Sequence, residues 1–136
     1  MNKDLSAEEQ KLVREAYFKS RDNTVEHDIS YVANLKSSTF NRLVSSDDPS
    51  LRRMGEAALQ LQRFIGDCLD GSWTAQPNVI HAYTAVLLYL VNPFDFIPDC
   101  TPERGYADDL YVLELGLADG GDALGDYAAA RGIHLP

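Results

Sequence analysis

The chain has few cysteines, and it has few cations where its acids are concentrated. Its 136 residues include two cysteines, Cys68 and Cys100, whose separation matches neither a metal site nor a disulfide framework. Residues 77–136 hold two arginines against nine acids, which gives −7 of the total net charge of −9. Because binding to a phosphate backbone requires clustered cations, this scarcity argues against a nucleic-acid partner. A basic protein partner, a metal ion or solubility alone would suit such an acidic surface.

Long apolar runs are also missing. The longest covers the 13 residues 79–91 and is interrupted by His81 and Thr84. As a helix it would extend about 20 Å, which is less than the roughly 30 Å hydrocarbon core of a bilayer. We therefore interpret it as a core helix. The first residues, MNKDLSAEEQ, lack the apolar centre of a signal peptide, so we expect a cytoplasmic protein.

Strand-type alternation, internal repeats and low-complexity tracts are absent from the sequence, whereas helical spacing of apolar residues recurs along it. Ser6 and Glu9 form the pattern of a capping box. Asp48 followed by Pro49 is a second start signal, and Gly71 is a stop signal. These patterns predict helices over 7–21, 24–35 with a short continuation to 44, 49–70, 77–91, 108–118 and 122–131. We predict one compact all-α domain of five or six helices.

The connector Asn92–Asp109 is the most unusual stretch, with five acids and three prolines between two apolar segments. Proline fixes a backbone angle and removes a donor, so the connector should be a stiff turn. Carboxylates in the first turn of the helix that follows are favoured by its dipole and unpaired amides. We predict a central helical hairpin in 77–136 that encloses this acidic turn, supported by the helices of 1–76. The residues predicted to form the turn are Pro93, Asp95, Pro98, Asp99 and Gly105.

The segment Leu88–Leu113, with the pattern YLVNPFDFIPD…GYADDLYVL, resembles the YkvA-like family, a bacterial helical domain of unknown function. The residues that carry the resemblance are Pro93, Asp95, Ile97, Pro98, Asp99, Gly105, Tyr106, Asp108 and Asp109. The resemblance covers roughly a quarter of the chain and implies a helical hairpin around the turn. Family members are often expected at membranes, which would here mean peripheral association without a transmembrane span. Phe94 and Phe96 depart from the aliphatic residues of the family pattern.

Five carboxylates in the connector must share a short stretch of chain, and each close pair would cost about 1 to 4 kcal/mol at a protein surface. They could diverge to cap backbone amides, share a proton that raises one pKa, or bind Mg²⁺, Mn²⁺ or Ca²⁺. Capping needs no ligand, and we favour it. The metal alternative would use Asp95, Asp99 and Asp109, with Asp108 as the alternate ligand.

No phosphate loop, serine nucleophile elbow or zinc motif occurs in the sequence, so we expect no catalytic residues and favour a non-enzymatic protein. The leading hypothesis is a small interaction or regulatory module, like an immunity protein or an adaptor, that binds a protein partner through its acidic C-terminal half. Tyrosines in that half suit a contact surface. The alternatives are a divalent-metal-dependent enzyme or metal-binding domain built on the acidic turn, and a peripheral membrane protein. The sequence specifies neither the partner nor an oligomeric state.

Overall fold

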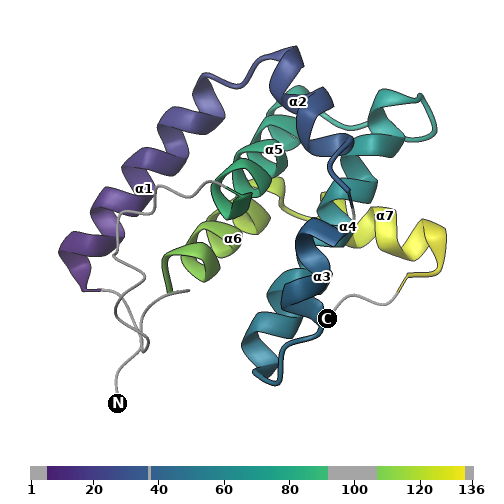
Figure 1. Cartoon of the computed structure of the whole chain (residues 1–136). Coiled ribbons are helices and arrows are strands. Elements are labelled where there is room, and N and C mark those ends of the chain that lie inside the picture. Colours follow the sequence, from purple (N-terminus) through teal and green to yellow (C-terminus); the bar gives the residue numbers. More distant parts are fainter. Residues whose placement is uncertain (1–5, 37, 92–106, 134–136) are drawn as a thin grey trace.

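The structure is a computed structural model, and it describes residues 6–36, 38–91 and 107–133, apart from the side chains of Ser38 and Arg42 (Figure 1). Over these residues the chain forms seven α-helices and no strand, which confirms the all-α prediction. The helices are α1 (Ala7–Asp22), α2 (Glu26–Ala33), α3 (Ser38–Val44), α4 (Pro49–Leu69), α5 (Pro77–Val91), α6 (Ala107–Gly120) and α7 (Ala123–Arg131). The count exceeds the expected five or six because the segment predicted as a continuation of the second helix is a separate helix, α3.

Local capping sets the start of α1 and of α4. The Ser6 hydroxyl accepts a hydrogen bond from the Glu9 N–H at 3.1 Å, while the Glu9 carboxylate accepts one from the Ser6 N–H at 2.9 Å. At α4 the Asp48 carboxylate accepts from the Ser50 N–H at 2.8 Å, and Pro49 occupies the first helical position. Both predicted start signals are confirmed, because each provides an acceptor for an amide that has no partner within its helix.

The second helix starts later than predicted. Its expected start followed Asn23 or Thr24, but α2 begins at Glu26 with Val25 in the N-cap position. The carboxylate of Asp28 accepts a hydrogen bond from the Val25 N–H at 3.0 Å. The acid at the third helical position therefore caps this helix by accepting from the N-cap amide, and no polar side chain is needed at the N-cap itself.

Helix α5 lies at the centre of the fold and packs against α1, α2, α4 and α6 (Figure 1). Its side chains are apolar on nearly every face, as a helix surrounded by others requires, and Ala82, Val86 and Leu87 are fully buried. Helix α6 packs closely on α5, so the predicted helical hairpin is confirmed. The turn residues Pro93, Asp95, Pro98, Asp99 and Gly105 lie outside the described residues.

Two glycines of α6 allow this close packing. A Cβ added at Gly116 would collide with the Val86 side chain, and one added at Gly120 would collide with the Tyr83 ring and hydroxyl. The two glycines lie four residues apart and therefore face the same side of α6. They give α5 a surface without side chains on which to lie. None of the described helices combines the length and the apolar character needed to cross a membrane.

Candidate functional site

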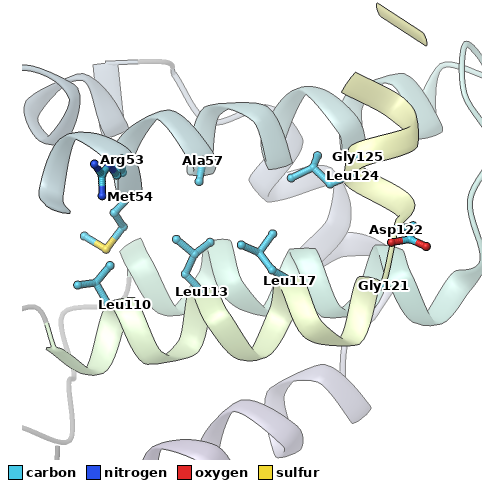
Figure 2. Close-up of a pocket in the computed structure, with 10 residues that line it drawn as sticks. All are labelled: Arg53, Met54, Ala57, Leu110, Leu113, Leu117, Gly121, Asp122, Leu124 and Gly125. Carbon is cyan, nitrogen blue, oxygen red and sulfur yellow. The ribbon is translucent and has the colours of Figure 1, made fainter. Parts of the chain in front are cut away.

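A groove of about 380 Å³ opens between α4 and α6 on the side away from α5 (Figure 2). Helices α4 and α6 each pack against α5 but make little direct contact with one another. Three leucines of α6, Leu110, Leu113 and Leu117, point across this gap toward Met54 and Ala57 of α4 (Figure 2). The groove thus has two apolar walls, contributed by helices that are far apart in the sequence.

Helix α7 closes one end of the groove through Leu124 and Gly125 (Figure 2). The chain turns from α6 into α7 at Gly121, whose φ of +58° lies in the left-handed region that glycine adopts without strain. The break falls between the helices predicted over 108–118 and 122–131, which confirms that they are separate. Asp122 lies at this closed end, and Arg53 lies at the opposite end (Figure 2). These two residues supply the charged side chains of the lining.

The lining divides into a floor and a rim. Met54, Ala57 and Leu113 are at most 7% exposed and belong to the hydrophobic core. Leu110 and Leu117 are only half-buried and remain in contact with solvent. An open apolar concavity with a few polar residues at its ends is the usual form of a binding site rather than of a packing defect. The described lining residues include neither a nucleophile nor an acid–base pair, and what they offer a ligand is the burial of an apolar surface.

A polar cluster attaches α7 to the C-terminal end of α4 and so holds the end wall of the groove in place. The Tyr127 hydroxyl donates a hydrogen bond to Asp67 Oδ2 at 2.6 Å, and Arg131 forms an ion pair with the same carboxylate at 3.4 Å. Arg131 also donates to the Ser72 carbonyl at 3.0 Å. Burial raises the pKa of Tyr127 to about 12, and its hydrogen bond to Asp67 contributes to the increase. The Trp73 ring packs edge-on against Tyr127 at 5.3 Å between centroids, so this indole lies against the core.

A second polar cluster joins α1 to the end of α6. Asp119 Oδ2 accepts hydrogen bonds from the Tyr17 hydroxyl and from Arg21, both at 2.8 Å. Burial raises the pKa of Tyr17 and the hydrogen bond to Asp119 raises it further, so this phenol stays protonated. The Asp119 carboxylate is therefore engaged in contacts within the fold. The exposed acids of the described C-terminal half that have no such intramolecular role are Glu114, Asp122 and Asp126.

The predicted metal ligands are only partly within the described residues. Asp95 and Asp99 lie outside them, whereas Asp108 and Asp109 lie in the first turn of α6, as predicted, and are 0% and 7% exposed. Asp108 Oδ2 accepts a hydrogen bond from the Tyr89 hydroxyl at 3.1 Å. Within the described part of the chain, no three acid, histidine or cysteine side chains converge as metal ligands would. The four-aspartate metal site stays a prediction.

Cysteine and histidine are the side chains of this sequence that could serve as nucleophile and base. Cys100 lies outside the described residues, and His81 is half-buried on α5. Cys68 on α4 is also half-buried; burial and the neighbouring carboxylates of Asp67 and Asp70 raise its pKa, which suppresses the thiolate. The described thiol is therefore poorly suited to act as a nucleophile.

The groove was not predicted from the sequence, although the apolar pattern of α6 contains a signal for it. Its apolar residues occupy two faces: Val112 and Gly116 face α5, and the leucines at 110, 113 and 117 form a second stripe. A helix that only covers a core needs one apolar stripe. The second stripe could have indicated a further packing surface.

Comparison with known families finds one match. Residues 82–115 match the model of a family described as "Protein of unknown function (DUF1232)". No curated protein and no solved structure matches the chain. The matched quarter of the chain comprises most of α5, the acidic connector and the first part of α6, and it supports a helical domain of unknown function.

Proposed function

We propose that this protein is a non-enzymatic interaction module that captures a protein partner in the groove between α4, α6 and α7. The observation that carries the proposal is the stripe of Leu110, Leu113 and Leu117, which forms one wall of an open groove among the described residues (Figure 2). Burying apolar surface of this kind yields about 25 cal/mol per Å². A partner that covers the stripe would gain free energy from the contact.

The surroundings of the groove favour a partner with basic residues. Glu114, Asp122 and Asp126 are exposed on α6, at the closed end of the groove and on α7. Residues 77–136 carry a net charge of −7, so their field attracts positively charged surfaces over a distance of about one Debye length. Complementary charges of this kind accelerate association and select among partners.

The YkvA-like resemblance of Leu88–Leu113 is compatible with this proposal but supplies no mechanism. We infer that the matched segment is a YkvA-like hairpin that positions α6, and that the protein acts in the cytoplasm. Peripheral attachment to a membrane through the hairpin is the remaining alternative from that resemblance. Flotation with liposomes would distinguish the two functions. A peripheral membrane protein rises with the liposomes, whereas an interaction module without membrane affinity stays at the bottom of the gradient.

The proposal is tested by affinity capture from native lysate with four forms of the protein, the wild type and three variants. Leu117→Glu places a charge on the rim of the groove, and the matched control Leu12→Glu places one on α1, where the leucine is 49% exposed and does not line the groove. We expect a protein captured by the wild type and by the control but lost from the Leu117 variant. Leu110→Glu provides a second substitution on the rim. Thermal melts check that all three variants are folded. Equal capture by all four forms would refute the proposal.

A further inference from the structure

We propose that the groove is the vacant fourth position of an up-and-down helical bundle, and that its occupant is an amphipathic helix of the partner running antiparallel to α4 and α6. The inference rests on the proposed function, because it names the chemistry and the direction of the segment that the groove accepts. Two independent features of the groove carry it: the direction of its walls and the charges at its ends.

The direction follows from connectivity. Helices α4, α5 and α6 succeed one another along the chain, and α5 packs against both of the others. The chain reverses between consecutive helices, so α4 and α6 both run antiparallel to α5 and parallel to one another. Figure 2 shows that α4 and α6 run in the same direction, because Arg53 to Ala57 and Leu110 to Leu117 advance the same way along the groove. In an up-and-down four-helix bundle, parallel helices occupy diagonal positions, and the fourth helix is antiparallel to both of its neighbours.

The walls also have the spacing that a packed helix requires. Leu110, Leu113 and Leu117 are separated by three and then four residues, and Met54 and Ala57 by three. This is the spacing of the apolar positions in a heptad seam, where each side chain inserts between those of the facing helix. The stripe from Leu110 to Leu117 extends about 10 Å. An occupant of three to four turns with leucine-sized residues at positions i, i+3 and i+7 would fill it.

Charge at the two ends of the groove gives the occupant a polarity. Arg53 and Asp122 are exposed, and among the described residues neither forms an ion pair. A helix antiparallel to α6 has its first turn beside Asp122 and its last turn beside Arg53. The partial positive charge of a helix N-terminus is favoured near a carboxylate, and the negative C-terminus near a guanidinium. The occupant should therefore carry a basic side chain in its first turn and an acidic one in its last.

Two designed peptides of about 15 residues, which is four helical turns, test the polarity. Both carry leucines on one face; one has arginine in its first turn and glutamate in its last, and the other has the reverse. Binding of each is measured by fluorescence anisotropy to the wild type and to the double variant Arg53→Glu/Asp122→Lys. Because each peptide is compared on two proteins, differences in its own helicity cancel. We expect the first peptide to bind the wild type about two- to thirtyfold more tightly than the second, as two exposed charge pairs would give, and the preference to invert by a similar factor on the double variant.

The direction is read separately by nuclear magnetic resonance on the wild-type protein. A nitroxide at the N-terminus of the first peptide should broaden the amide signals of Gly121 and Gly125, and one at its C-terminus those of Arg53 and Met54. The opposite pattern, or an affinity ratio that does not change, would overturn the inference. Self-association of the protein that changes the same amide signals would also overturn the inference, because a second copy would then be the occupant. If neither peptide binds while capture from lysate still depends on Leu117, the inference fails and the proposed function stands; capture that ignores Leu117 removes the proposed function itself.

Discussion

The Tyr127 hydroxyl donates a hydrogen bond of 2.6 Å to Asp67 across 60 residues of sequence. This bond joins α7 to the last turns of α4, and α7 forms the end wall of the groove. Asp67 also forms an ion pair with Arg131, whose guanidinium lies over the rings of Trp73 and Tyr127 at 5.8 and 5.5 Å. The position of the end wall thus depends on one carboxylate and its two partners.

Replacing Tyr127 with phenylalanine should remove the hydrogen bond and retain the ring contacts with Phe64 and Trp73. We expect the free energy of unfolding to fall by about 1.5 to 3 kcal/mol, which is typical of a lost hydrogen bond to a charged group. Urea denaturation measures the change. Tyr31→Phe is the matched control, because Tyr31 is 50% exposed and its hydroxyl forms no hydrogen bond among the described residues. An equal loss in both variants would contradict this account.

Alkaline pH should destabilise this protein more than a protein whose tyrosines are exposed. The pKa of Tyr127 is raised from 10 to about 12 in the fold, chiefly by burial, and burial also raises the pKa values of Tyr17 and Tyr83. A raised pKa favours the protonated form of the folded state, so its contribution to stability is complete below pH 10. That contribution is lost as pH rises from about 10 through 12, where the unfolded phenol ionises first. Urea melts from pH 8 to about 11.5 should show this decline, and Tyr127→Phe should reduce it; an identical pH profile for the two proteins would exclude Tyr127 as a cause.

Alanine at Gly120 should be destabilising, although alanine is the better helix former. The added Cβ would collide with the Tyr83 hydroxyl and ring, and overpacking of this kind costs about 1 to 3 kcal/mol. Gly66 on α4 is the control, because a Cβ there meets no atom within 4 Å, and Gly66→Ala should stabilise the protein by about 0.5 to 1 kcal/mol. In a Tyr83→Phe background the cost of Gly120→Ala should decrease, because the nearest atom is gone. A cost unaffected by that background would show that the collision is not with the hydroxyl.

Divalent metals should leave the thermal stability unchanged if the aspartates of the connector cap backbone amides. If instead Asp95, Asp99, Asp108 and Asp109 hold a metal ion, a concentration of 100 times its Kd should add about 2.7 kcal/mol. Thermal melts with Mg²⁺, Mn²⁺, Ca²⁺ or EDTA distinguish the capping hypothesis from the metal-binding hypothesis. A rise in melting temperature with one metal, reversed by EDTA, would establish the metal-binding alternative.

Much of the local structure could be predicted from the sequence. The capping box at Ser6, the start at Asp48–Pro49, the stop at Gly71 and the break at Gly120–Gly121 all depend on residues within one turn of one another. Such signals act over a few residues, so no knowledge of the rest of the chain is needed. The same holds for the placement of Asp108 and Asp109 in the first turn of α6.

The burial of Asp108 and the groove itself could not be predicted in this way. Burial of that carboxylate depends on α5, whose Tyr89 hydroxyl reaches it. The groove depends on α4 and α6 standing apart on either side of α5, and α7 closes it through a contact across 60 residues. Periodicity reports that a helix has an apolar face but not which element covers that face.

By itself, the sequence determined that the chain is helical, where most helices begin and end, and that an apolar helix lies at the centre. Only the tertiary structure decided which side chains meet: Tyr17 with Asp119 across 102 residues, Gly120 with Tyr83, and the leucine stripe of α6 across a groove from Met54 and Ala57 of α4. The physical reason is range. Capping and helical periodicity act within a few residues, whereas packing selects partners by shape and charge among elements that the chain brings together only when it folds.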